Sequence, residues 1–196
     1  MDYAFIILSF CICVICNHFL TKATSDHISN YVISLCHASI VYLFSRLYYV
    51  FTLKFICCSI GYFLYDTYSL LKNKNKQLRN VYILHHVVCI CGYIYIWTNK
   101  EINKYLPEIT YIIGGIELTS SISHIGTLLK SRNDINMKFL LKIFDGIGLY
   151  AWIYYRIYLT YVYFDILSLD YLGYMVFMIF LISIGSVYFQ ILNLFL

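Results

Sequence analysis

Two adjacent histidines, His85 and His86, lie near the start of an apolar stretch that runs from Val81 to Trp97. An imidazole titrates near neutral pH and can act as a general base, a nucleophile or a metal ligand. Adjacent residues on a helix point about 100° apart. We therefore expect one histidine to face a cavity while a carboxylate holds the other, and Asp66 is the candidate. Such a carboxylate fixes the tautomer of the imidazole and raises its basicity.

The composition places these residues in a membrane protein. Of the 196 residues, 61% are hydrophobic and 12% are charged, whereas soluble domains have about 45–50% apolar and about 25% charged residues. The apolar runs are continuous and lack the alternation of a membrane β-barrel. The sequence therefore predicts an all-α, polytopic membrane helical bundle with no soluble domain. No charged tail is present, so nucleic acid is not an expected partner.

The apolar runs predict about seven transmembrane helices, because each reaches the roughly 20 residues that a bilayer requires. The predicted spans cover about Tyr3–Leu20, Tyr31–Val50, Leu53–Leu71, Val81–Trp97, Glu108–Leu129, Phe139–Phe164 and Tyr171–Leu196. Residues 1–29 form an N-terminal span and loop, and residues 30–196 form a six-helix membrane domain. All eight cysteines lie inside apolar runs without a CxxC pair. They are interpreted as packing residues, and no metal site is expected.

The positive-inside rule predicts the orientation of these spans. Nine basic residues fall in the loops on one side: Lys22, Lys72, Lys74, Lys76, Arg79, Lys130, Arg132, Lys138 and Lys142. Three fall on the other side: Lys54, Lys100 and Lys104. The expected topology has an N-terminus outside or lumenal and a cytosolic C-terminus.

Titratable side chains gather at one predicted depth. At about 1.5 Å per residue, they lie roughly 6–9 Å inside the cytosolic hydrocarbon edge. The layer comprises His37, Asp66, His85, His86, His124 and Asp145. Agreement among five helices favours a shared site over scattered, tolerated polar residues.

Two of the predicted helices carry a polar stripe at helical spacing. The fifth presents Gly114, Glu117, Ser121 and His124, with Glu117 deeper than the layer. The sixth presents Asp145, Gly148, Trp152 and Arg156. Arg46 and Arg156 lie in the outer half of the bundle, and we expect both to pair internally with buried carboxylates.

Four motifs in order resemble those of the TLC-domain family of multi-span membrane proteins, which includes the ceramide synthases and less defined lipid-homeostasis proteins. They are ISLCHAS with His37, GYFLYD with Asp66, YILHHVV, and GIELTSS with Glu117 and Thr119. The resemblance covers about residues 30–195. The chain is more similar to the non-synthase members that carry GYxxxD, because Glu117 stands where the synthases continue with a further His-Asp pattern.

The resemblance implies a helical bundle that encloses a lipid-sized cavity, in the endoplasmic reticulum or a related endomembrane. The predicted catalytic residues are His85, His86 and Asp66. The cavity lining is expected to be His37, Glu117, Thr119, Ser121, His124 and Asp145. Basic loops flank this layer and could hold lipid head groups or the phosphates of coenzyme A: Lys72, Lys74, Lys76, Arg79, Lys130 and Arg132.

The expected function is the binding or processing of an acyl lipid, with N-acyl transfer from acyl-CoA as the enzymatic version. No cofactor is expected, and acyl-CoA would be a substrate. The expected partner is membrane lipid, and the formation of a homodimer is left as a possibility. One alternative is a proton-coupled transporter or channel that uses Glu117, His124 and Asp145. Another is a membrane redox protein with bis-histidine haem, held by His37 and His86.

Overall fold

The computed structural model describes residues 3–47, 53–72, 76–100, 102–130 and 137–158, and all statements below concern these residues. This part of the chain is all-α. Its α-helices are α1 (Tyr3–Ala23), α2 (Asp26–Leu47), α3 (Leu53–Leu71), α4 (Lys76–Thr98), α5 (Leu106–Lys130) and α6 (Met137–Trp152). A short 3-10 helix, η1 (Ile102–Tyr105), precedes α5, and a π-helix, η2 (Ile153–Tyr158), follows α6.

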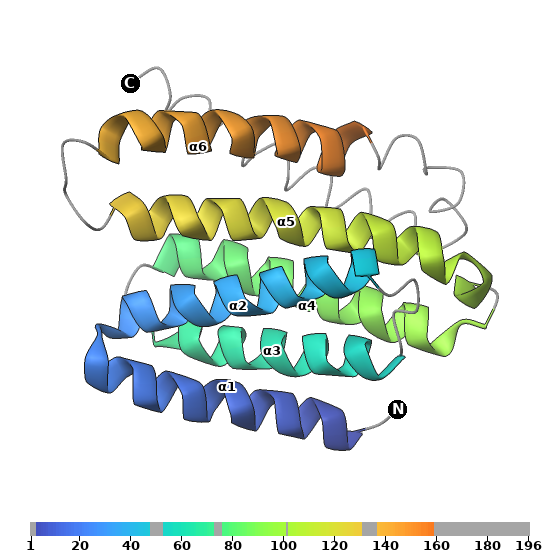
Figure 1. Cartoon of the computed structure of the whole chain (residues 1–196). Helices are drawn as coiled ribbons and strands as arrows, with labels where there is room; N and C mark the ends of the chain where they lie inside the picture. Colours follow the sequence, from blue (N-terminus) through green and yellow to red (C-terminus); the bar gives the residue numbers. More distant parts are fainter. Residues whose placement is uncertain (1–2, 48–52, 73–75, 101, 131–136, 159–196) are drawn as a thin grey trace.

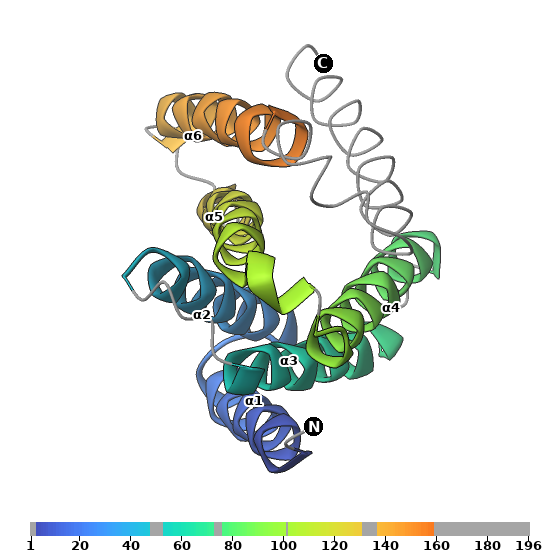
Figure 2. The ribbon, with the colours of Figure 1, turned by 90° about the vertical axis from the view of Figure 1, so that its right-hand side faces the viewer.

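The helices lie side by side with roughly parallel axes (Figure 1). Viewed along those axes, α3 lies between α1 and α4, while α5 lies between α2 and α6 (Figure 2). Helix α2 also contacts α1 and α3, so it joins the two groups. The core therefore lies where α2 and α3 meet α4 and α5, and it includes the fully buried Val41, Ile56 and Tyr65.

Helix α1 is held against α3 by a close backbone crossing. A Cβ atom built on Gly61 would meet the carbonyl oxygen of Ile6 and would lie 2.8 Å from Cβ of Ser9. The Ser9 hydroxyl donates a hydrogen bond of 2.7 Å to the carbonyl oxygen of Cys58. Small residues and hydroxyl groups at a helix crossing are characteristic of membrane helix packing.

The polar stripe predicted on the fifth span is the face of α5 that packs on α2. The Ser121 and Ser39 hydroxyls lie 3.5 Å apart, and the ring of His124 lies edge-on to Tyr31. Near the other end of the same interface, a Cβ atom on Gly114 would overlap the Ser45 side chain. Gly114, Ser121 and His124 of the predicted stripe thus lie at the interface with α2, and the small residues allow the two helices to approach closely.

Asp145 and Gly148, the first two residues of the stripe on the sixth span, likewise face α5. Oδ1 of Asp145 lies 3.9 Å from the position of a Cβ on Gly126, and Ile122 of α5 lies 3.2 Å from that of Gly148. Trp152, one turn further along α6, is buried. Both predicted stripes therefore position helices.

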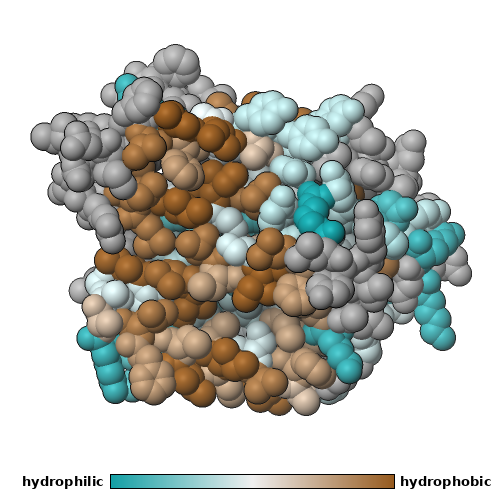
Figure 3. All heavy atoms as spheres, viewed as in Figure 1, coloured by the Kyte–Doolittle hydropathy of each residue, from teal (hydrophilic) through white to brown (hydrophobic). Residues whose placement is uncertain are grey.

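The outer surface of the described bundle is largely apolar. Helix α1 buries only Ile6 and exposes large apolar side chains such as Ile7, Ile12 and Phe19. In Figure 3 apolar residues dominate the visible face, and hydrophilic ones gather toward its ends. Two segments of the described part have the length and apolar composition to span a membrane, Tyr3–Ala23 and Ile28–Arg46, and a shorter apolar helical segment covers Tyr82–Thr98.

Most helices extend beyond the apolar runs that predicted them. The third has the predicted bounds, but α2 begins at Asp26 and α4 at Lys76, five residues before the predicted starts in each case. The Ile28 amide donates to Oγ of Ser25 at 3.4 Å, and Asp26 lies in the positive first turn of α2. The proposed boundary between residues 29 and 30 therefore falls inside a helix. The predicted seventh span, Tyr171–Leu196, and the end of the sixth lie outside the described residues.

Candidate functional site

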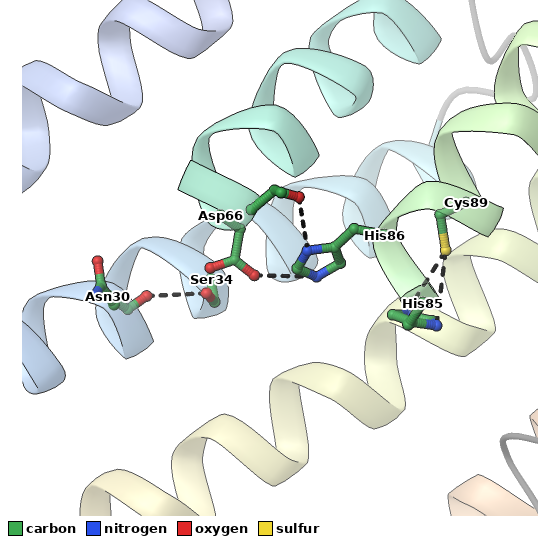
Figure 4. Close-up of polar contacts among 7 residues, drawn as sticks. Asn30, Ser34, Asp66, His85, His86 and Cys89 are labelled. Atoms are coloured by element: carbon green, nitrogen blue, oxygen red, sulfur yellow. Dashed lines mark hydrogen bonds and ion pairs between the residues drawn. The ribbon is translucent and has the colours of Figure 1, made fainter. Parts of the chain in front are cut away.

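The carboxylate of Asp66 on α3 contacts the imidazole of His86 on α4. Oδ2 of Asp66 lies 3.2 Å from Nε2 of His86, and the exposed fractions of the side chains are 19% and 5% (Figure 4). The two residues are 20 positions apart in the sequence, and the packing of α3 on α4 brings them together. The expectation that Asp66 holds one of the two histidines is confirmed, while its catalytic role stays a prediction.

The second ring nitrogen of His86 also has a partner. Nδ1 lies 3.2 Å from the hydroxyl oxygen of Thr67, which directly follows Asp66 on α3. A neutral imidazole has one donor and one acceptor nitrogen. The carboxylate of Asp66 only accepts, so the neutral ring carries its proton on Nε2 and accepts at Nδ1 from the Thr67 hydroxyl. Asp66 and Thr67 therefore fix both the tautomer and the orientation of His86.

His37 of α2 joins this pair through Tyr62. The two rings are stacked, with centroids 3.8 Å apart and an interplanar angle of 13°. Tyr62 lies one turn before Asp66 on α3 and interacts electrostatically with that carboxylate. Nε2 of His37 is buried without a hydrogen-bond partner in the described part of the chain.

Phe63 supplies an apolar wall for these polar groups. Its ring centroid lies 5.3 Å from that of His86, 6.0 Å from His37 and 5.9 Å from Tyr93. Phe63 itself is buried. Enclosure by aromatic rings lowers the local dielectric, which strengthens the interaction of Asp66 with His86.

Glu117 is the buried carboxylate that α5 contributes. It interacts electrostatically with Tyr62 of α3 and Tyr93 of α4. Tyr93 and Thr67 were not among the predicted site residues. A signal exists for both, because Tyr93 follows His86 by two helical turns and Thr67 adjoins Asp66.

His85 points away from the Asp66 pair, as its position beside His86 predicts (Figure 4). Its ring nitrogens lie 3.7 and 3.9 Å from Sγ of Cys89, one turn further along α4. The centroids of the two imidazoles are 5.7 Å apart. His85 is thus adjacent to the site but belongs to a different face of α4.

The other residues predicted to line a cavity lie at helix interfaces. The Thr119 hydroxyl donates to the carbonyl oxygen of Ile116 at 2.6 Å, and Ser121 and His124 face α2. Asp145 faces α5 beside Gly126. The single polar layer expected from depth is therefore divided: His37, Asp66 and His86 lie around the aromatic cluster, His85 faces Cys89, and His124 and Asp145 lie where α5 packs on α2 and α6. Depth alone does not specify the direction in which a side chain points.

The predicted head-group residues are only partly described. The Lys72 ammonium lies 4.4 Å from the centroid of the Tyr68 ring, and Nε of Arg79 is buried without a hydrogen-bond partner among the described residues. Lys74 and Arg132 lie outside the described residues, as do the side chains of Lys76 and Lys130. Phosphate binding by this loop face stays a prediction.

Arg46 does not form the carboxylate pair that the sequence analysis expects. Its guanidinium lies over tyrosine rings, and no described carboxylate contacts it. A cation over an aromatic face gains electrostatic stabilisation without a counter-ion. The side chain of Arg156 lies outside the described residues.

Bis-histidine haem at His37 and His86 would have to displace one of the partners that hold His86. Both ring nitrogens of His86 are engaged, and Phe63 contacts both imidazoles. Within the described ranges, no group of three or more His, Cys, Asp or Glu side chains is arranged to hold a metal ion.

Comparisons with protein-family models, with curated proteins and with solved structures give no match for this sequence.

Proposed function

We propose that the chain is a multi-span membrane protein that binds an acyl lipid, with Asp66 and His86 as its reactive pair. The proposal is supported by the apolar outer surface of the helices and by the enclosed contact between the two side chains. The contact between Oδ2 and Nε2 is the observation that carries it, because a histidine that is buried and oriented by a carboxylate equips a site for general-base chemistry. The proposal includes membrane spanning by helices other than the two apolar segments Tyr3–Ala23 and Ile28–Arg46. It also includes location in the endoplasmic reticulum or a related membrane.

The proposed reaction is acyl transfer to a lipid amine or hydroxyl group. The nucleophile displaces the Thr67 hydroxyl from Nδ1 of His86 and gives its proton to that nitrogen. It bonds to the carbonyl carbon of an acyl thioester such as acyl-CoA, and the carbon–sulfur bond breaks. The imidazolium, stabilised by the Asp66 carboxylate, then returns the proton to the departing thiolate. The products are an acylated lipid and a free thiol.

His37 and Glu117 would position the polar end of the lipid. The buried Nε2 of His37 has an open hydrogen-bonding position, and Glu117 can accept from an amine or hydroxyl group. Phe63 and Tyr93 would contact the adjoining apolar part.

The test is lipidomics of cells that express the wild type, His86→Ala, Asp66→Asn or His18→Ala. His18 is exposed on α1 and contacts only the ring of its neighbour Phe19 among the described rings, so it is the matched histidine control. We expect the wild type and His18→Ala to change the same lipid species, and both site variants to abolish that change. Equal lipid profiles for wild type and His86→Ala at equal protein level would refute the enzymatic proposal. Proton flux in liposomes that required Glu117 would instead favour the transporter.

A further inference from the structure

A second polar group lies at the other end of the bundle from the basic loop between α3 and α4. Arg46, the penultimate residue of α2, is surrounded by three tyrosines, which together we call the Arg46 cage. Its Cζ lies 3.7 Å from the ring centroid of Tyr111 on α5, 5.4 Å from Tyr42 on α2 and 5.5 Å from Tyr155 on η2. Three elements distant in sequence thus converge on one cation.

Among the described residues, the guanidinium has no hydrogen-bond acceptor. Nη2 is buried and has no partner in the described structure. No hydrogen bond from Nε or Nη1 to a described residue is present either, and Arg46 as a whole is only partly buried. Five N–H donors in a planar fork match the oxygens of a phosphate or carboxylate. Tyrosine rings stabilise the positive charge through their faces, but they do not accept hydrogen bonds from the N–H groups of the guanidinium.

The cage is fixed by the packing of its helices. A Cβ on Gly115 would overlap the ring of Tyr155, and one on Gly114 would overlap Ser45, the neighbour of Arg46. The glycine pair therefore lets α2 and η2 approach α5 at the level of the cage. Ser45 is buried and its hydroxyl donates to the carbonyl oxygen of Tyr42 at 2.7 Å. The arginine is consequently held in place before any ligand binds.

We propose that the Arg46 cage binds a phosphate group, and that a membrane lipid head group supplies it. Arg46 ends a membrane-length helix, which places its charge at the depth of head groups when α2 spans a bilayer. Tyrosines at that depth present an apolar ring to lipid and a hydroxyl to the head group. The site rests on the membrane embedding in the proposed function and is independent of the acyl chemistry at His86.

The test uses the purified full-length chain in detergent and native mass spectrometry. The probes are a phosphatidic acid and a diacylglycerol with the same acyl chains, so the two ligands differ only in the phosphate. We expect the wild type to retain phosphatidic acid at least about tenfold better. We expect Arg46→Gln to reduce that preference by about ten- to a hundredfold, the range for a lost hydrogen bond to a charged group. Inorganic phosphate is added as a competitor, and we expect no displacement.

Lys54→Gln is the matched control, since Lys54 lies in the first turn of α3 at the same end of the bundle and contacts the Phe5 ring. An equal loss in both variants would show a general charge effect and overturn the cage. Displacement by inorganic phosphate would overturn the lipid source.

If Arg46→Gln does not fold, Arg46→Lys is the second variant, because it keeps the charge without the planar fork of donors. We expect Arg46→Lys to lose the preference for phosphatidic acid. An unchanged preference would contradict phosphate recognition by the guanidinium. Lipid turnover at His86 is measured in a separate experiment, so failure of the proposed function can be distinguished from failure of the Arg46 cage.

Discussion

The ring of Tyr62 lies parallel to that of His37, with the two centroids 3.8 Å apart. One aromatic side chain on α3 therefore stacks on the His37 imidazole of α2 and also interacts electrostatically with the Asp66 carboxylate. Tyr62 therefore contributes both to the packing of α3 on α2 and to the polar surroundings of Asp66.

Replacing Tyr62 by phenylalanine separates these two contacts. Tyr62→Phe keeps the stacked ring and removes the hydroxyl, so we expect a loss of about 1 kcal/mol in stability. Tyr62→Ala also removes the buried ring and should cost about 3–5 kcal/mol. Thermal unfolding in detergent measures both. Equal losses for the two variants would mean that the ring contributes nothing beyond the hydroxyl.

The contact between Asp66 and His86 predicts energetic coupling. Either alanine variant leaves its partner, the buried His86 or the partly buried Asp66, without this contact, which costs about 1–3 kcal/mol. The double variant removes both groups, so its loss should be smaller than the sum by about 0.5–3 kcal/mol. A double-mutant cycle of unfolding free energies provides the value. Strict additivity would show that the two side chains do not interact in the folded protein.

Gly61 and Gly146 provide a matched test of the α1–α3 crossing. A methyl group at Gly61 would meet α1, whereas one at Gly146 on α6 has nothing within 4 Å. We expect Gly61→Ala to destabilise by about 1–3 kcal/mol through overpacking. Gly146→Ala should be neutral or stabilise by up to about 1 kcal/mol through helix propensity. An equal decrease in the melting temperatures of the two variants would contradict the described crossing of α1 and α3.

The cysteines test whether the bundle lies in a membrane. Cys11, Cys16, Cys36 and Cys91 are exposed, and Cys57 is buried. If lipid covers the apolar surface, a membrane-impermeant maleimide should leave the exposed four unmodified in intact vesicles, although a lipophilic maleimide reacts with them. Cys57 should resist both reagents. Mass spectrometry of the labelled peptides gives the pattern, and rapid modification of all four by the impermeant reagent would argue against embedding.

Much of the helical framework follows from the sequence because apolar composition and helical spacing are local properties. The bounds of α3, the two interface stripes and the pairing of Asp66 with His86 were all predictable in this way. The start of α2 was not, since Asp26 and Ser25 favour a helix start through capping and charge while contributing no apolar signal.

The directions of individual side chains were harder to predict. His124 shares a depth with His86 but lies against Tyr31, because its angular position on α5 faces α2. Arg46 was expected to pair with a carboxylate, and its tyrosine partners come from α2, α5 and η2, whose convergence depends on tertiary packing. Rotation about the helix axis, which depth does not reveal, decides such contacts.

The π-helix from Ile153 to Tyr158 determines which tyrosine reaches Arg46. Hydrogen bonds from residue i to i+5 widen the turn and accommodate an additional residue within it. A chain one residue shorter in this segment could continue as a regular α-helix, and the following positions would turn by about 100°. The length of this single turn, as much as the identity of its side chains, thus selects Tyr155 as the third wall around the guanidinium.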